Sequence, residues 1–227
     1  HHFRLYNSSR NEIVPSFYIS GGSNPDPPTI DAITSPNNNN KPTITGNGVT
    51  GHTITLFVNT VSTQLTDIVG SDGTWSITLV NPLPEASQEI TAKATDTNGN
   101  ESDASIAQTI VIDITAPDPP TIDSITSPTS DTTPTITGNG ITGHTIKLFE
   151  GTNEIGQDTV VSGEWSITPS SSLNDGSYDI TAKATDLAGN QSGSSTSQTI
   201  VINTTNSNNT YSNGVLTLSS WGTKSRW

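Results

Sequence analysis

An internal repeat constrains the fold of this chain more than any other feature of its sequence. The segment PDPPTIDAITSP at 25–36 returns as PDPPTIDSITSP at 117–128, and KPTITGNGVTGHTITLF at 41–57 returns as TPTITGNGITGHTIKLF at 133–149. Further along, ITAKATDTNGN at 90–100 returns as ITAKATDLAGN at 180–190. The offset is 92 residues early in the repeat and 90 later, which indicates one module present twice, with a loop shortened in the second copy.

The repeat divides the chain into four parts. We expect one module over residues 24–115 and a second over 116–205, flanked by a non-repeat N-terminal segment, 1–23, and a non-repeat C-terminal tail, 206–227. His1 and His2 resemble a remnant of a purification tag and are set aside. Each module contains ten acidic residues and two lysines, so the net charge of −13 originates in the repeat and not in the flanks.

Composition and the spacing of turn residues predict an all-β fold. Thr, Ser, Asn and Asp are abundant, Met and Cys are absent, and prolines and glycines are spread along the chain. Alternating apolar and polar residues indicate half-buried strands, and seven such strands at short intervals are typical of a Greek-key β-sandwich. In the first module we expect strands at Thr29–Ile33, Pro42–Thr45, Thr53–Val58, Gln64–Val69, Thr74–Leu79, Glu89–Thr95 and Ala107–Asp113.

Aromatic residues at strand positions are assigned to the core of each sandwich. Trp75 alternates with Ile77 and recurs as Trp165, so each tryptophan is expected to anchor a core that has no disulfide. By the same reasoning Phe57 and its counterpart Phe149 are expected to face inward.

The strongly acidic charge excludes two classes of partner. Nucleic acids and anionic membrane surfaces are bound by basic patches, so neither is expected here. No apolar run approaches the ~20 residues of a membrane-spanning helix, and membrane insertion is not expected either. The absence of Cys rules out thiolate metal sites and fits an exported bacterial surface protein. The acidic residues either serve solubility or collect a cation, and both interpretations stay open.

Strand counting brings acidic residues from two segments to one end of the second module. The stretch VIDITAPDPPTID, 111–123, connects the modules, and the loop TDLAGNQS, 185–192, joins the sixth and seventh expected strands. Because successive strands alternate in direction, this loop should return to the end at which the linker enters. Carboxylates gathered there repel one another, and Ca²⁺, which accepts about six to eight oxygen ligands, relieves that repulsion. The predicted junction site comprises Asp113, Asp118, Asp186 and Asn190.

The first module offers a similar set of oxygen ligands. This first-module site comprises Asp26, Asp96, Asn98 and Asn100, with Asp103 close by in sequence. Asp31 and Asp123 alternate with the inward Ile30 and Ile122, which is typical of solvent-facing residues, but they lie close enough to the acidic segments to be second-tier ligand candidates. The alternative interpretation of both loops is an Asx turn, in which Asp and Asn bind backbone groups while Gly supplies a positive φ.

The residues at the junction resemble those of a known family. ATDLAGNQS and QTIVI, which close a module, and VIDITAPDPPTI, which opens the next, resemble the tandem bacterial Ig-like repeats of giant type I-secreted, biofilm-associated adhesins of Gram-negative bacteria. The resemblance covers Asn24 to Asn203. It implies two tandem Ig-like Greek-key β-sandwiches arranged as an extended rod, stiffened by Ca²⁺ at the junctions. One departure is Asn203, which stands where the first copy has Asp113, so the next junction is absent or altered.

The resemblance also implies a role and a location. Such a segment is a structural spacer of a surface adhesin that supports cell adhesion and biofilm formation. It would be secreted, lie at the bacterial cell surface and be monomeric. Its partners would be neighbouring modules of the same chain and, through other domains, a host or biofilm surface.

Catalysis is not expected, and two other classes of function remain as alternatives. His52 and His144 occupy the same repeat position without a nucleophile or second base nearby, and no hydrolase or phosphate-binding motif is present. One alternative is an Ig-like ligand-binding module for a glycan or a host receptor. The other is an accessory module of a secreted polysaccharide-acting enzyme or a phage tail protein. A sugar platform needs exposed aromatic rings, and those left for it are Tyr178 and, in the tail, Tyr211, Trp221 and Trp227.

Overall fold

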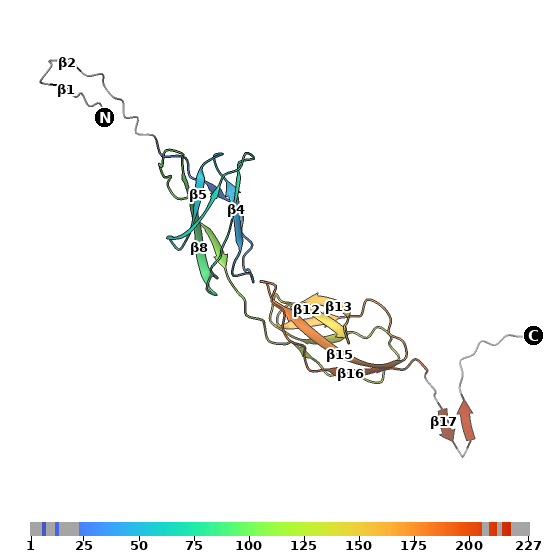
Figure 1. Cartoon of the computed structure of the whole chain (residues 1–227). Helices are drawn as coiled ribbons and strands as arrows, with labels where there is room; N and C mark the ends of the chain where they lie inside the picture. Colours follow the sequence, from blue (N-terminus) through green and yellow to red (C-terminus); the bar gives the residue numbers. More distant parts are fainter. Residues whose placement is uncertain (1–5, 8–11, 14–22, 206–208, 213–214, 219–227) are drawn as a thin grey trace, which may run out of the picture. The chain divides into compact units, whose positions relative to one another are not determined.

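The structure is a computed structural model that describes residues 6–7, 12–13, 23–205, 209–212 and 215–218. The chain divides into two compact units, unit 1 (His1–Asp113) and unit 2 (Ile114–Trp227), which are coloured from blue to green and from green to red in Figure 1. Every regular element among the described residues is a β-strand, which confirms the predicted all-β fold. Within the same residues no helix is long and apolar enough to cross a membrane.

Unit 1 contains two antiparallel sheets that enclose one core. A three-stranded sheet has the order β3-β4-β7, and a four-stranded sheet has the order β6-β5-β8-β9. All seven expected strands are present, with boundaries that differ from the prediction by up to three residues. They are β3 (Thr29–Ile30), β4 (Thr43–Asn47), β5 (Thr53–Val58), β6 (Val61–Ile68), β7 (Thr74–Thr78), β8 (Ser87–Thr95) and β9 (Gln108–Val111).

Unit 2 repeats this architecture, and the flanks add two hairpins. Its sheets have the orders β10-β11-β14 and β13-β12-β15-β16. The strands are β10 (Thr121–Ile122), β11 (Ile136–Asn139), β12 (Thr145–Glu150), β13 (Asn153–Thr159), β14 (Glu164–Ile167), β15 (Gly176–Thr185) and β16 (Gln198–Ile202). The hairpins pair β1 (Tyr6–Asn7) with β2 (Glu12–Ile13) and β17 (Asn209–Ser212) with β18 (Val215–Leu218).

The fourth strand of each unit lies in the four-stranded sheet, unlike the fourth strand of a constant-type Ig domain. A two-residue turn determines this pairing in unit 1. Val58 pairs with Val61, and the intervening Asn59 and Thr60 have φ angles of 47° and 68°, as a type I′ turn requires. The strand was expected to begin only at Gln64, because a turn without glycine does not stand out in the sequence.

Trp75 and Trp165 anchor the two cores, as predicted. Each side chain is only 2% exposed. Each indole Nε1 donates a hydrogen bond at 3.3 Å to a backbone carbonyl of the neighbouring strand, Asn47 for Trp75 and Asn139 for Trp165. The ring therefore fills the space between the sheets without leaving its one polar atom unpaired.

The prediction that Phe57 and Phe149 face the core is wrong. Strand β5 turns Ile54 and Leu56 inward, so Phe57 lies on the outer face of the sheet, half-buried. Lys93 Nζ lies 5.7 Å from the centroid of the Phe57 ring, and the same contact recurs in unit 2. Leu56, Phe57 and Val58 are consecutive apolar residues, so alternation alone does not show which of them face the core; in the structure Leu56 is buried and Phe57 is not.

Two edge strands of unit 1, β9 and β7, make hydrogen bonds to other parts of the chain. Next to β9, Asn37 pairs in parallel fashion with Ile112, and its N–H donates to Val111 O at 2.9 Å. On the opposite side, Asp67 of β6 accepts a hydrogen bond from the backbone N–H of Ser76 on β7, at 2.8 Å. The corresponding bond in unit 2 joins Asp158 and Ser166 at 2.9 Å. A carboxylate thus connects the two sheets and occupies an edge N–H that another strand could use.

We expect Gly138→Ala to destabilise unit 2. A Cβ at this position would lie 2.5 Å from Cζ2 of Trp165 and against the carbonyl oxygen of Thr121, so neither neighbour can yield easily. The expected loss is on the order of 3 kcal/mol. Gly193→Ala is the control, because the nearest atom to its Cβ, Pro119 Cγ, is 3.8 Å away and the expected change is below about 0.5 kcal/mol. Hydrogen exchange of the amides in β11 and β14 measures both, and equal effects would contradict the steric explanation.

Candidate functional site

In unit 1 the loop after β8 folds around one carboxylate. Asp96 Oδ1 accepts hydrogen bonds from the backbone N–H groups of Asn98 (2.8 Å) and Asn100 (2.9 Å). Asp96 Oδ2 accepts another from the side-chain amide of Asn100 at 2.8 Å. Gly99 turns the chain with a φ of 85°. The structure therefore brings together three of the four residues of the predicted first-module site, in the geometry of an Asx turn.

In unit 2 the loop after β15 has the same geometry. Asp186 Oδ1 accepts the backbone N–H of Asn190 at 2.8 Å, and Asp186 Oδ2 accepts the side-chain amide of Asn190 at 2.9 Å. Gly189 has a φ of 95°. Two of the four predicted junction residues are thus in direct contact. A carboxylate has about four lone-pair sites on its two oxygens, so Asp186 Oδ2, which accepts one hydrogen bond from Asn190, keeps acceptor capacity.

The loop hydrogen bonds also keep both carboxylates ionised. The side-chain and backbone N–H groups of Asn100 are the main causes that lower the pKa of Asp96 below 3.8. For Asp186, burial acts to raise the pKa, but hydrogen bonds from Asn190 and from the backbone of Gly189 and Ala188 together outweigh it, so the pKa is lowered. Each loop thus holds a fixed negative charge at neutral pH.

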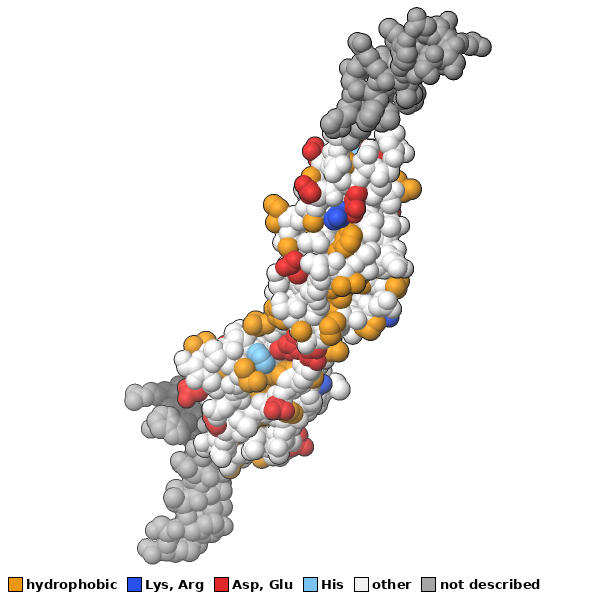
Figure 2. All heavy atoms as spheres, turned by 90° about the vertical axis from the view of Figure 1, so that its left-hand side faces the viewer, with side chains coloured by type: hydrophobic (Ala, Val, Ile, Leu, Met, Phe, Trp, Pro, Cys, Tyr) orange, Lys and Arg blue, Asp and Glu red, His pale blue; other side chains and the backbone are white. Residues whose placement is uncertain are grey.

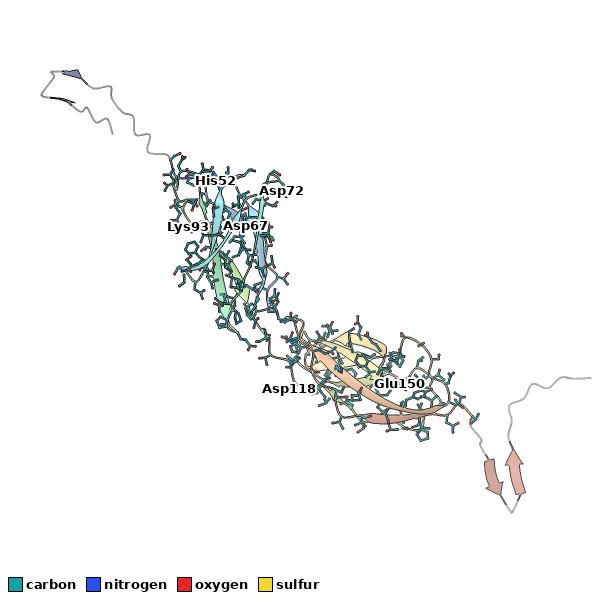
Figure 3. The ribbon with its side chains drawn as sticks, in the orientation of Figure 1. His52, Asp67, Asp72, Lys93, Asp118 and Glu150 are labelled. Carbon is teal, nitrogen blue, oxygen red and sulfur yellow. The ribbon has the colours of Figure 1, made fainter. Side chains whose placement is uncertain are left out.

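The linker meets the Asp186 loop at one end of unit 2, as strand counting predicts. A Cβ on Gly193, just beyond the loop, would lie 3.8 Å from Cγ of Pro119 in the linker. Asp118, which immediately precedes this proline, is exposed at the end of unit 2 where the chain enters it (Figure 3).

The remaining predicted ligands are Asp113 and Asp26. Asp113 belongs to unit 1, where its backbone N–H donates to Asn37 O at 3.1 Å. Asp26 is exposed before β3, and no contact joins it to the Asp96 loop among the hydrogen bonds of the described residues. Within residues 23–205 and the described parts of the flanks, no three His, Cys, Asp or Glu side chains form a group that could hold a metal ion. Both calcium sites stay predictions.

Asp31 and Asp123 have a different environment from the loops. Asp31 Oδ2 accepts a hydrogen bond from Thr45 Oγ1 at 2.6 Å, and Asp123 Oδ2 accepts one from Thr137 Oγ1 at 2.7 Å. Both bonds lie on the outer face of a three-stranded sheet. Each of these carboxylates therefore orients one threonine hydroxyl on the sheet surface.

A hollow lies on this face of unit 2. It has a volume of about 630 Å³, and its lining includes Asp123, Asp158, Glu164 and Ser166. Trp165 also lines it, but this side chain is 2% exposed and presents no ring face for stacking. Tyr178 packs partly against the core and donates its hydroxyl to Asn174 O at 2.9 Å. Neither aromatic residue offers the sugar platform considered above.

The burial of four serines was not predicted from the sequence. Ser102 and Ser105 in unit 1 recur as Ser192 and Ser195 in unit 2, each at most 9% exposed. The hydroxyl of Ser192 accepts the backbone N–H of Ala184 at 2.8 Å and donates to Gly193 O at 2.7 Å. The serine hydroxyls accept backbone N–H groups along the last part of β8 and β15, as the carbonyl groups of a neighbouring strand would otherwise do. The available signal was the S-x-x-S spacing that both copies share.

Comparison with known families agrees with this architecture. A family model described as "Bacterial Ig-like domain" matches residues 20–114 and again residues 120–204. The two matches together cover most of the chain, and they coincide with the two seven-stranded sandwiches. The chain therefore belongs to the bacterial Ig-like domain family, which confirms the resemblance to tandem bacterial Ig-like repeats.

Several solved structures are similar to the chain at low sequence identity. A structure titled "Biofilm associated protein - BSP domain" is 22% identical, with a TM-score of 0.31 over 78% of this chain and 29% of that one. A structure of a bacterial ice-binding adhesin is 23% identical, with a TM-score of 0.39 over 78% of this chain and 64% of that one. The chain thus spans less than two thirds of either structure. No curated protein sequence matches the chain.

We expect Asn190→Ala to raise the pKa of Asp186 toward 3.8, because it removes a side-chain donor to the carboxylate. Since the folded pKa is lowered, the stability that this carboxylate contributes is present above its unfolded pKa and is lost as the pH falls through the folded value. The variant should therefore show a weaker dependence of stability on pH below about 4. NMR titration of the carboxyl carbons measures the pKa, with Asp96 in the same molecule as the unchanged control. A pKa of Asp186 that does not move would contradict the assigned cause.

We expect Ser192→Ala to cost about 1–3 kcal/mol of stability in unit 2, because the buried N–H of Ala184 loses its partner. Ser194→Ala is a matched control, since Ser194 is exposed two residues further along. Chemical denaturation of the full chain measures both variants. Indistinguishable midpoints would show that water replaces the serine hydroxyl.

Proposed function

We propose that the chain is a spacer segment of a bacterial surface adhesin, secreted to the cell surface, where it supports adhesion and biofilm formation by holding other domains away from the cell. The observation that carries the proposal is the duplication itself. The two units repeat the same core, the same edge contacts and the same Asx loops. A spacer needs modules that fold alike and add length, whereas recognition depends on a particular site.

The surface of the repeat supports a spacer better than an enzyme. Acidic side chains are scattered over the visible face of both units with few basic ones among them (Figure 2). Such a surface favours solubility and opposes association between copies through like-charge repulsion. His52 and His144, the only histidines besides His1 and His2, each have a buried Nδ1 without a hydrogen-bond partner, so no second group orients either ring through this nitrogen as it would in a general base.

We further propose that Ca²⁺ stiffens the junction between modules. The linker contains prolines that restrict its bending, and it meets the Asp186 loop at the end of unit 2. The Asp186 carboxylate is fixed by its loop and ionised, which lowers the ordering cost for a bound cation. Asp118 and Asp113 are the ligands that would complete the site, and hard oxygen donors of this kind suit Ca²⁺. The Asp96 loop offers the corresponding site in unit 1.

The spacer role can be tested by replacing this segment in the adhesin that carries it. Replacing residues 24–205 by two unrelated Ig-like modules of similar length should preserve adhesion of the cells, and deleting them should weaken it. If the replacement abolishes adhesion as fully as the deletion, these modules themselves recognise the target and the spacer proposal is wrong.

We expect Ca²⁺ to raise the melting temperature of the full chain relative to chelator. At a concentration 100 times the Kd, binding contributes about 2.7 kcal/mol, which corresponds to a shift on the order of 10 °C for modules of this size. Asp118→Asn should reduce this shift while leaving the melting temperature in chelator unchanged, because Asp118 is exposed.

Asp131→Asn is the control, since Asp131 lies in the loop between β10 and β11, away from the linker. Calorimetric titration with Ca²⁺ gives the stoichiometry. Melting curves that coincide in Ca²⁺ and in chelator would exclude the junction site without touching the spacer role.

A further inference from the structure

A short motif, Asn-x-Ser/Thr, occurs five times in the sequence, at Asn7, Asn100, Asn190, Asn203 and Asn208. In glycosylated proteins the asparagine of this motif accepts a sugar on its side-chain nitrogen. The motif is short enough to arise by chance, so the structural setting has to distinguish one copy from another. The copies at Asn7 and Asn208 include residues outside the described part of the chain, and the other three can be compared.

The motifs at Asn100 and Asn190 are engaged by the fold of their loops. The side-chain amide of Asn100 donates to the carboxylate that its loop encloses at 2.8 Å, and that of Asn190 does so at 2.9 Å. The hydroxyl residues of these motifs, Ser102 and Ser192, are only 4% and 5% exposed. Each of these hydroxyls accepts a backbone N–H of the preceding strand and donates to a neighbouring carbonyl. An enzyme that reads the amide and the hydroxyl together can reach neither motif in the folded chain.

The motif at Asn203 has the opposite setting. Asn203, Thr204 and Thr205 follow β16, the last strand of unit 2, and all three are exposed. Asn203 Oδ1 accepts hydrogen bonds from the backbone N–H of Thr205 at 3.1 Å and from its Oγ1 at 2.8 Å. Thr204 is held by Asp175, whose Oδ1 accepts its N–H at 3.0 Å and its Oγ1 at 2.8 Å. The turn therefore places the amide and the hydroxyl of the motif side by side on the surface, and its bonds to Asn203 go to Oδ1 and not to Nδ2.

The first copy of the module shows that this turn does not need an asparagine. Asp113 and Thr115 occupy the corresponding positions. The backbone is placed alike in both copies, since the N–H of Asp113 donates to Asn37 O at 3.1 Å and that of Asn203 donates to Thr129 O at 2.8 Å. Aspartate and asparagine both accept hydrogen bonds in turns of this kind, so a carboxylate oxygen could replace Oδ1. What asparagine adds is the amide nitrogen, and with it the complete motif.

We propose that Asn203 is an N-glycosylation site, which accepts a sugar activated by a diphosphate. In the transfer, Nδ2 of Asn203 forms a bond to the anomeric carbon of the sugar. The bond from this carbon to the phosphate oxygen breaks, the diphosphate leaves with the bonding electrons, and one amide proton passes to a base of the glycosyltransferase. The attached sugar adds a bulky polar group at the end of unit 2, at the position where the first copy has the charge of Asp113. The proposal does not depend on the spacer role or on Ca²⁺.

Mass spectrometry of the adhesin isolated from the cells that produce it naturally tests the proposal. We expect a sugar mass on peptides that contain Asn203, with electron-transfer fragmentation assigning it to this residue, and no sugar on Asn100 or Asn190. A single sugar unit would identify a nucleoside diphosphate as the donor, and a uniform oligosaccharide would identify a lipid diphosphate; both support the site. An unmodified Asn203 overturns the proposal. Equal modification of Asn100 or Asn190 also overturns it, because the structural setting would then not select the site.

Variants produced in the same cells test the role of the motif. Asn203→Asp, which installs the residue of the first copy, and Thr205→Ala should each abolish the sugar, whereas Thr205→Ser keeps the hydroxyl and should retain it. Thr204→Ala is the matched control, because the middle position of the motif tolerates any residue except proline. All of these positions are exposed, so the variants should remain folded. A sugar that persists on Asn203 in Thr205→Ala, or that is lost in Thr204→Ala, would contradict recognition through the motif.

Discussion

The contact between an indole ring and a glycine determines how each sandwich closes. Without cysteines, no disulfide holds the sheets together, and one tryptophan per unit fills the space between them. The ring lies so close to the backbone of β4 that Gly46 has no room for a Cβ, and Gly138 repeats this in β11. Glycine weakens a strand, because it has no side chain to pack and loses more entropy on folding. Both units have this destabilising glycine at the same position, because a larger residue there would displace the tryptophan ring from the core.

Several acidic residues of the modules bind backbone N–H groups through their carboxylates. Asp67 connects β6 to β7, and Asp96 closes the loop after β8, each through main-chain donors. Among the described residues only two ion pairs are found, Lys93 with Glu101 and Lys147 with Glu154. The negative charge is therefore not neutralised by lysines, although much of it is fixed in place. Ordered carboxylates with spare acceptor capacity are what a cation site needs, which links the architecture of the repeat to the proposed role of Ca²⁺.

The fold could be predicted well from the sequence, because each pattern of strand and turn residues occurs in both copies of the repeat. The seven strands, the core position of Trp75 and the return of the Asp186 loop to the linker all follow from alternation and counting. Three features did not follow. Phe57 lies in a run of apolar residues whose parity is ambiguous, the turn at Asn59 has no glycine, and the buried Ser192 resembles any polar loop residue. In each case tertiary contacts decide what local propensity leaves open.

Of the candidate site, only the contacts within a single loop could be predicted from the sequence. Asp186 and Asn190 lie in a single short turn, so their contact follows from local geometry. Convergence with Asp113 depends on the angle between two modules, and no pattern within a module encodes that angle. A comparison of the two copies separates residues that the fold of a module requires from residues that it does not require. Where they agree, as at Asp96 and Asp186, the shared chemistry first serves the fold of each loop. Where they differ, as at Val61 and Asn153, the side chain is exposed in both copies, and the same sandwich forms with either residue.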